Sequence, residues 1–290
     1  MNPALGRAPA SPIEVRLAGG LKLQGRVWPC ESPRALIAIV HGLGEHSGRY
    51  AALASDLTQR QYTVAALDLP GHGESPGTRG DAPSWSMLRE QVVPATLTAA
   101  HGLPGQPQTL PVVLLGHSLG GVLALDYALA HPQRLIAVVA SAPALRTTMP
   151  PWWKLALANV ARVTTPAAGF PNGLDVSGIS RDPEVLRLRA EDPLMHDRIT
   201  PRLYFDYNEA CQRVLRDARR LQIPALVLQG SADRVVQPRG ASEFVLAAPA
   251  GLARLVTLPD AYHEVFNDVS RAAAVRDLLV WLEALPALRR

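Results

Sequence analysis

The chain has 290 residues, of which 48% are hydrophobic and 19% are charged, and its formal net charge is +4. This length suits one large α/β core, or one such core that carries an inserted cap. The basic residues are scattered and are not interleaved with aromatic residues, so we expect no nucleic-acid partner. The two cysteines, Cys30 and Cys211, form neither a disulfide framework nor a metal-binding pattern, and they suit a reducing cytosol.

No segment has the composition of a membrane span or a secretory signal. The first twelve residues lack the apolar core of a signal peptide. The longest uncharged stretch, residues 102–125, contains Pro104 and Pro107 and divides into a loop, a strand and a helix, which argues against a membrane span. We therefore expect a cytoplasmic protein.

In the first half of the chain, apolar runs alternate with helical patterns. Residues 13–28 alternate around Gly19-Gly20 and predict a hairpin at the edge of a sheet. The rest of this half predicts buried strands at residues 36–40, 62–67, 112–115 and 135–140, and helices at residues 50–60, 85–101 and 119–129. Such alternation is typical of an α/β fold with a doubly wound, mostly parallel sheet and helices on both faces.

The alternation stops after residue 143. Residues 144–216 contain no convincing buried strand and include an apolar helical piece, so we predict a helical cap over the ligand-binding edge of the sheet. The pattern then returns, with strands at residues 225–229 and 253–258 and helices at residues 238–247 and 270–285. The predicted organisation is therefore a core formed by residues 1–143 and 217–290, with residues 144–216 inserted as a cap.

The sequence Gly116-His117-Ser118-Leu119-Gly120 separates a buried strand from a helix and fits the G-x-S-x-G nucleophile elbow. Glycines at its two ends allow the strand and the helix to approach closely. The N-terminus of the helix directs free N–H groups and a positive dipole end toward the serine, which favours an oxyanion beside it. The alternative is an ordinary strand-to-helix turn with an exposed serine.

A serine nucleophile needs a base and a carboxylate that orients the base. After a nucleophile elbow the chain order is Ser, then Asp or Glu, then His. We predict His263 as the base because it follows a predicted strand, whereas its rival His196 lies in the insertion. We predict Asp233 as the carboxylate because it follows the strand at residues 225–229; its rival is Asp260, three residues before His263.

The sequence His41-Gly42-Leu43-Gly44 ends an earlier strand and is expected to supply the second oxyanion donor. We assign the two donors to the backbone N–H groups of Leu43 and Leu119, and we take Gly42 as a candidate substrate contact. The pair Glu45-His46 is interpreted as a surface loop; the alternative is that it contacts substrate. Three other histidine side chains are interpreted as structural: His41, His72 and His117.

Five motifs resemble those of the monoacylglycerol lipase and lysophospholipase group of α/β-hydrolases: HGLGEHSGRY, DLPGHGES, GHSLGG, GSADRVV and YHEVFN. The segments ISRDPEV and DPLMHD look like the cap of that group, so the resemblance extends over nearly the whole chain. It implies an α/β-hydrolase fold with Ser118 as nucleophile, His263 as base, Asp233 as its orienter, and the oxyanion donors on Leu43 and Leu119. It also implies that the cap forms an apolar tunnel for an acyl chain.

We therefore expect a serine carboxylic-ester hydrolase that releases fatty acid from monoacylglycerols through an acyl-enzyme on Ser118, with no metal or organic cofactor. A lysophospholipase or a general carboxylesterase is the alternative within this class, and a lipid-binding homologue without turnover is the alternative outside it. Trp152 and Trp153 are candidate substrate contacts. One hypothesis is that their helix gives transient peripheral membrane contact through the cap; the alternative is that the helix packs onto the core. Acyl length, head group and oligomeric state stay open.

Overall fold

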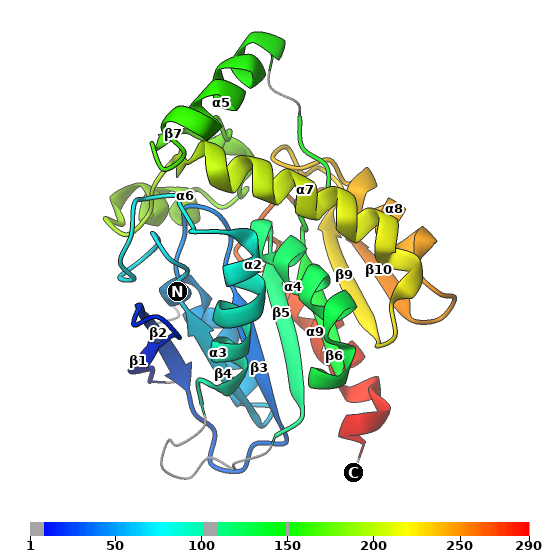
Figure 1. The fold of residues 1–290 in the computed structure, drawn as a ribbon. Helices are drawn as coiled ribbons and strands as arrows, with labels where there is room; N and C mark the ends of the chain where they lie inside the picture. Colours follow the sequence, from blue (N-terminus) through cyan, green and yellow to red (C-terminus); the bar gives the residue numbers. More distant parts are fainter. Residues whose placement is uncertain (1–8, 101–109, 149–150, 290) are drawn as a thin grey trace.

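The computed structural model describes residues 9–100, 110–148 and 151–289. Its centre is an eight-stranded sheet with the order β1-β2-β4-β3-β5-β6-β9-β10 (Figure 1). The strands are β1 (Ser11–Arg16), β2 (Lys22–Trp28), β3 (Ala35–Val40), β4 (Tyr62–Leu67), β5 (Val112–His117), β6 (Ala137–Ser141), β9 (Ala225–Gly230) and β10 (Ala253–Leu258). The β1–β2 hairpin is antiparallel and lies at the edge, β2 is antiparallel to β4, and the remaining pairs are parallel. The predicted mostly parallel sheet with an edge hairpin is confirmed.

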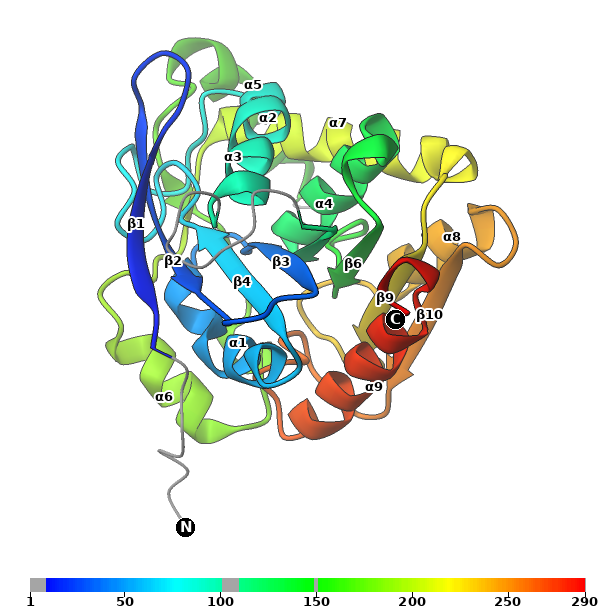
Figure 2. The same ribbon diagram turned by 90° about the horizontal axis from the view of Figure 1, so that it is seen from below.

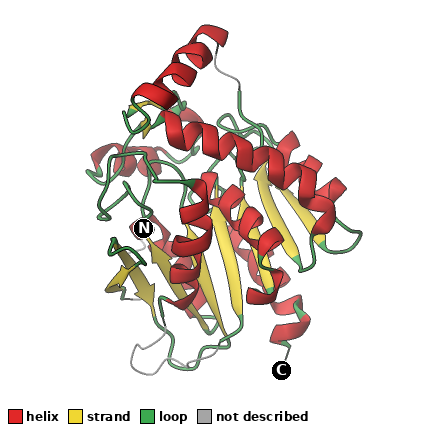
Figure 3. Ribbon diagram, viewed as in Figure 1, coloured by secondary structure: helices red, strands yellow, loops and turns green. Residues whose placement is uncertain are grey.

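Helices cover both faces of the sheet (Figures 2 and 3). One face is covered by α1 (Ala51–Thr58) and α9 (Arg271–Ala284), and the other by α2 (Trp85–Met87), α3 (Val93–Thr98), α4 (Leu119–Ala130) and α8 (Arg239–Ala247). The strands supply both cores because successive side chains point to opposite faces. In β3, for example, Leu36 and Ala38 join the core beneath α4, whereas Ile37 and Ile39 join the core beneath α1 and α9. Burial on both faces explains why these strands read as continuous apolar runs.

The helix predicted at residues 85–101 is divided into three pieces. A wider, π-type turn at Leu88–Val92 separates α2 from α3, and α3 ends at Thr98. Pro94 at the start of α3 has no N–H to donate and its ring crowds the preceding turn, which a wider turn relieves. The last residue of the prediction, His101, lies outside the described residues.

Between β6 and β9 the described residues form three α-helices and a short strand pair, at the end of the sheet where the parallel strands finish (Figure 1). The elements are α5 (Trp152–Thr164), β7 (Phe170–Pro171), α6 (Pro183–Glu191), β8 (Arg198–Ile199) and α7 (Pro201–Asp217). α7 packs along α4 and buries one face, formed by Leu203, Tyr207, Ala210 and Val214 at helical spacing. Within the described ranges, no helix has both the length and the apolar character that crossing a bilayer requires.

Candidate active site

Ser118 occupies the sharp turn between β5 and α4. Its backbone has φ 54° and ψ −118°, a conformation that residues other than glycine rarely adopt. A Cβ atom on Gly116 would lie 2.0 Å from the carbonyl oxygen of Gly120, and one on Gly120 would lie 2.3 Å from the carbonyl oxygen of Val40. Only glycine fits at either position, so the predicted strand–turn–helix geometry is confirmed.

The side chains of Ser118, His263 and Asp233 form one hydrogen-bonded chain. His263 follows β10 and Asp233 follows β9, so both lie with Ser118 at the carboxyl ends of the strands. The distance from Ser118 Oγ to His263 Nε2 is 2.9 Å, and that from His263 Nδ1 to Asp233 Oδ2 is 2.8 Å. Because a carboxylate only accepts, Nδ1 donates to Asp233 and Nε2 is left to accept the serine hydroxyl proton. This is the geometry that base-assisted nucleophilic attack requires.

The Asp233 carboxylate is buried and held by four donors. Besides His263, the backbone N–H groups of Val235 and Val236 donate to Oδ1, each at 2.9 Å, and Gln229 Nε2 donates to Oδ2 at 2.8 Å. Burial opposes ionisation, but the neighbouring His263 and the hydrogen bonds from the backbone lower the pKa of Asp233 below its usual value. Gln229 was not identified from the sequence; the available signal was a polar residue within the otherwise apolar strand ALVLQ.

The two rival residues lie elsewhere. Asp260 is exposed, has a positive φ of 56°, and makes no hydrogen bond to His263 among the described contacts. The ring of His196 stacks against His72, with 4.7 Å between the ring centroids, rather than lying beside Ser118. The structure therefore brings the residues favoured by the sequence together and leaves their rivals apart.

Leu119 directly follows Ser118, and Leu43 directly follows Gly42, where an added Cβ atom would lie 3.2 Å from Ser118 Cβ. In the part of the chain that the structure describes, neither leucine's backbone N–H has a hydrogen-bond partner, so both are free to donate to an oxyanion. His41 fixes the orientation of the first donor: its Nε2 accepts from Leu69 N–H at 2.9 Å, so its Nδ1 donates to the Gly42 carbonyl at 2.8 Å. That carbonyl belongs to the same planar peptide as Leu43 N–H, which is directed the opposite way.

The histidines interpreted as structural are all buried. His72 Nδ1 donates to the Pro70 carbonyl at 2.9 Å. His117 Nδ1 lies 3.2 Å from the Ser141 carbonyl, and its ring centroid lies 4.8 Å from that of His263. Burial lowers the pKa of His41, of His72 and of His117, which favours neutral rings.

The prediction that Glu45-His46 forms a surface loop is wrong. The two residues are 4% and 5% exposed, because the loop after β3 lies beneath the segment that joins β6 to β9. Glu45 Oε1 accepts the Gly42 N–H at 2.5 Å. His46 Nδ1 accepts from Gly48 N–H, so its Nε2 donates to Asp192 Oδ2 at 2.9 Å. The sequence does not reveal which loops a distant segment will cover.

A cavity of about 920 Å³ lies between α5 and α7. Its wall is joined to the elbow, because Tyr207 O–H donates to the Ala144 carbonyl and Ala144 N–H donates to the Ser118 carbonyl at 3.1 Å. Trp152 and Trp153 do not line this cavity and are 80% and 49% exposed. The lining mixes apolar and polar side chains, among them Leu145, Leu155, Phe205, Tyr207, Asn208 and Gln212.

Comparison with known proteins agrees with this geometry. The Hydrolase_4 family model, described as serine aminopeptidase S33, matches residues 31–270. A monoacylglycerol lipase from Mycolicibacterium smegmatis is 32% identical over 91% of this chain and 94% of its own length. The phospholipase YtpA from Bacillus subtilis is 27% identical over 84% of this chain and 93% of its own. The crystal structure of a monoacylglycerol lipase from Paleococcus ferrophilus superposes with a TM-score of 0.79 and 32% identity, covering 94% of this chain and 98% of that one.

The family match covers well over half of the chain, and the fold and the serine elbow agree with it. The chain therefore belongs to the Hydrolase_4 family of serine α/β-hydrolases, within its monoacylglycerol lipase group.

Proposed function

We propose that the protein hydrolyses monoacylglycerols to fatty acid and glycerol, with Ser118 as nucleophile. The observation that carries this proposal is the continuous chain from Ser118 Oγ through His263 to the buried Asp233 carboxylate. The names of the similar lipases support the substrate class.

In the proposed mechanism, Ser118 attacks the ester carbonyl while His263 Nε2 takes its proton. The tetrahedral oxyanion is held by the N–H groups of Leu43 and Leu119. Glycerol leaves with the proton from His263, which gives the acyl-enzyme. Water then attacks the acyl-enzyme by the same route and releases the fatty acid. Asp233 holds the imidazole in the tautomer that can accept the serine proton and stabilises the imidazolium that forms.

We further propose that residues 144–216 form a cap and that the cavity between α5 and α7 receives the acyl chain. Its volume lies within the range of about 300–1,000 Å³ that is usual for small-molecule sites. Ala156 on α5 is an exposed residue that lines this cavity and contacts no part of the Ser–His–Asp chain. We expect Ala156→Trp to narrow the cavity, to lower turnover of long-chain esters and to leave butyrate esters unaffected. Equal turnover of all chain lengths by this variant would contradict the assignment.

We propose that the outer face of α5 makes transient peripheral contact with a membrane and that lipid enters the protein there. Trp152, Leu157, Val160 and Val163 are all more than 60% exposed, an unusual density of large apolar side chains on one surface helix. We expect Trp152→Ser to lower co-sedimentation with phosphatidylglycerol vesicles. Unchanged sedimentation would favour a helix that is simply exposed. We keep the cytoplasm as the proposed location.

The test of substrate class is fatty-acid release from 1-monoacylglycerols with chains from C8 to C18, compared with lysophosphatidylcholine, p-nitrophenyl butyrate and an aminoacyl p-nitroanilide. Faster release from the monoacylglycerols is the expected result. Faster release from lysophosphatidylcholine would favour the phospholipase alternative, for which the YtpA similarity is the specific observation. Turnover of the butyrate ester alone would reduce the proposal to a general carboxylesterase. An aminopeptidase, the activity in the family's description, would cleave the anilide.

A hydrolase-like protein that binds lipid without turnover is the remaining alternative. A fluorophosphonate probe distinguishes it, because the probe forms a covalent bond only with an activated serine. We expect stoichiometric labelling of the native protein, and no labelling would favour the binding protein.

A further inference from the structure

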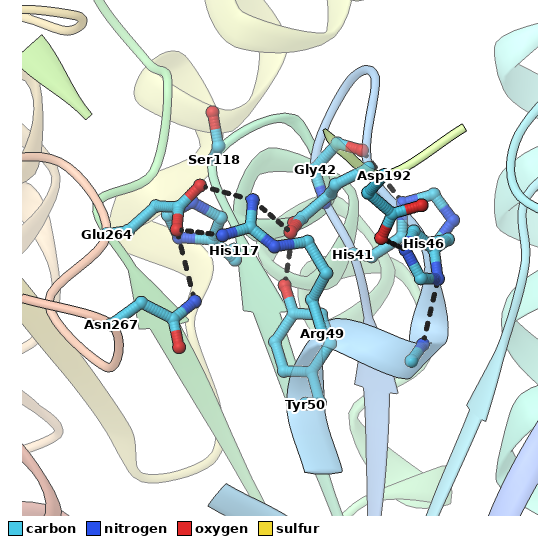
Figure 4. Close-up of polar contacts among 12 residues, drawn as sticks. His41, Gly42, His46, Arg49, Tyr50, His117, Ser118, Asp192, Glu264 and Asn267 are labelled. Atoms are coloured by element: carbon cyan, nitrogen blue, oxygen red, sulfur yellow. Dashed lines mark hydrogen bonds and ion pairs between the residues drawn. The ribbon is translucent and has the colours of Figure 1, made fainter. Parts of the chain in front are cut away.

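Three charged side chains that the proposed mechanism does not use lie buried near Ser118: Glu45, Arg49 and Glu264 (Figure 4). Their side chains are only 6%, 11% and 7% exposed. Burying charges is costly unless they are paired and hydrogen-bonded, so a buried charge cluster beside a reaction centre calls for an explanation.

The guanidinium of Arg49 lies between the two carboxylates. It binds Glu264 through two parallel hydrogen bonds, from Nη1 to Oε1 at 2.8 Å and from Nη2 to Oε2 at 2.7 Å. Such bidentate pairs fix relative orientation as well as distance. Nη1 also lies 3.9 Å from Glu45 Oε2. Asn267 Nδ2 also donates to Glu264 Oε2 at 3.1 Å, so this carboxylate oxygen accepts a second hydrogen bond (Figure 4).

The other oxygen of Glu45 holds the loop that carries one proposed oxyanion donor. Glu45 Oε1 accepts the Gly42 N–H at 2.5 Å and the Tyr50 O–H at 2.8 Å. Gly42 directly precedes Leu43, and a Cβ atom on Gly42 would lie 3.0 Å from Glu45 Oε1 and 3.2 Å from Ser118 Cβ. The Gly42 backbone is thus confined between the nucleophile and the Glu45 carboxylate.

Glu264 holds the loop that carries the proposed base, because it is the residue directly after His263. Its backbone N–H donates to the Ile179 carbonyl at 2.8 Å, and its side chain binds Arg49. Arg49 lies in the short 3-10 helix Ser47–Tyr50 that follows the Gly42–Glu45 segment, and Glu264 is 215 positions away in the chain, so this ion pair joins two distant segments. Burial opposes ionisation of Glu45, yet the positive charge of Arg49 and the hydrogen bond from Gly42 N–H help to lower its pKa below the usual value, so its carboxylate is charged at neutral pH.

We propose that Glu45, Arg49 and Glu264 act as positioning residues that fix the oxyanion loop (residues 42–45) relative to the base loop (residues 263–268). This inference rests on the proposed function, since it takes Leu43 N–H as an oxyanion donor and His263 as the base. None of the three side chains touches the reacting atoms. They set the spacing between the group that receives the proton and the group that stabilises the negative charge, and that spacing matters most in the transition state.

The kinetic consequence is a split between kcat and KM. The cavity assigned to the acyl chain lies between α5 and α7 and is not lined by any of the three residues. Loosening the two loops therefore weakens transition-state binding and leaves substrate binding nearly unchanged. We expect Glu264→Gln, which keeps the shape and removes the charge, to lower kcat for p-nitrophenyl butyrate about tenfold or more, with KM within about twofold of wild type.

Two variants of Arg49 test whether the guanidinium fork carries the effect. Arg49→Met removes the charge and every side-chain hydrogen bond, whereas Arg49→Lys keeps the charge but places all donors on one nitrogen, so the two-nitrogen fork is lost. We expect kcat to fall furthest in Arg49→Met and to be partly restored in Arg49→Lys. Equal kcat values in both variants and wild type would overturn the proposal.

The Arg181–Asp268 pair supplies a matched control. It is a partly buried ion pair on the same base loop, but it connects that loop to the start of α6 rather than to the oxyanion loop. We expect Arg181→Lys to lower the melting temperature while kcat stays within about twofold of wild type. An equal loss of kcat in Arg181→Lys and Glu264→Gln would overturn the proposal, because any weakening of the base loop would then suffice.

Two further measurements keep the test decisive. If Glu264→Gln does not fold, the rate of fluorophosphonate labelling of Arg49→Lys replaces it: a slower rate supports the proposal and a wild-type rate overturns it. Ser118→Ala separates this inference from the function on which it rests. If Ser118→Ala turns the ester over as fast as wild type, both fail; if only Glu264→Gln matches wild type, the positioning role alone fails.

Discussion

Replacement of Asp233 by Asn would change the tautomer of His263 while the size and shape of the side chain at position 233 stay the same. Oδ1 of Asp233 accepts two backbone N–H groups, so the carbonyl oxygen of Asn must occupy that position. The amide NH₂ then replaces Oδ2 and faces His263 Nδ1, which must become an acceptor. The imidazole proton moves to Nε2, where it prevents His263 from accepting the proton of Ser118.

The loss of activity is expected to be large and the loss of stability small. A wrong tautomer in a Ser-His-Asp triad typically lowers kcat about 10⁴-fold, which corresponds to about 5.4 kcal/mol of transition-state stabilisation. The fold should tolerate the change because Gln229 Oε1 is buried and has no hydrogen-bond partner among the described residues. After rotation of the Gln229 amide, that oxygen can accept from the new NH₂ group, so we expect the free energy of unfolding to fall by no more than about 1 kcal/mol.

The assay is hydrolysis of p-nitrophenyl butyrate and of a monoacylglycerol, with thermal unfolding measured on the same samples. Asp260→Asn is the matched control, since it makes the same chemical change on an exposed residue three positions before His263, and Asn tolerates the positive φ there. We expect Asp260→Asn to keep wild-type activity. A fall of less than tenfold in Asp233→Asn, or an equal fall in Asp260→Asn, would refute the assignment of the orienting carboxylate.

Three further outcomes are expected. Gly44→Ala should destabilise the fold by at least ~1 kcal/mol more than Gly19→Ala, measured by urea unfolding: both glycines have positive φ, but a Cβ on Gly44 would lie 2.2 Å from a backbone carbonyl oxygen, whereas one on Gly19 would meet open space. Burial opposes ionisation of Asp268, but hydrogen bonds from a neighbouring arginine lower its pKa from 3.8 to about 2. Its contribution to stability is therefore present above pH 3.8 and lost as the pH falls toward 2, so the unfolding free energy of Asp268→Asn should decline less steeply than that of wild type over this range. Burial raises the pKa of the Cys211 thiol to about 12. A disulfide reagent should therefore modify Cys30 first and Cys211 only after denaturation. Rapid modification of both cysteines in the native protein would contradict the packing around α7.

Features that depend on local sequence were predictable. The apolar runs of β3 and β5 identified strands buried on both faces, and the elbow glycines identified a turn that no other residue fits. The Ser, Asp, His order then restricted the candidates, and the structure joins the three side chains by two short hydrogen bonds.

Features that depend on contacts between distant segments were not predictable. Glu45 and His46 have the composition of a surface loop, yet both are buried, and His46 binds Asp192 in the distant segment between β6 and β9. The role of Gln229 in holding Asp233 follows from the geometry of the loop after β9 rather than from residue type. The π-type turn before α3 results from the position of Pro94 within a helical pattern that otherwise looked continuous.

The most direct test of the account compares wild type with Ser118→Ala in two assays, fluorophosphonate labelling followed by intact-mass measurement and fatty-acid release from a monoacylglycerol. We expect wild type to gain the mass of one probe and to release fatty acid, and Ser118→Ala to do neither while it keeps the wild-type unfolding transition. Fatty-acid release by folded Ser118→Ala at the wild-type rate would show that the reaction uses another nucleophile and would contradict the proposed mechanism at its centre.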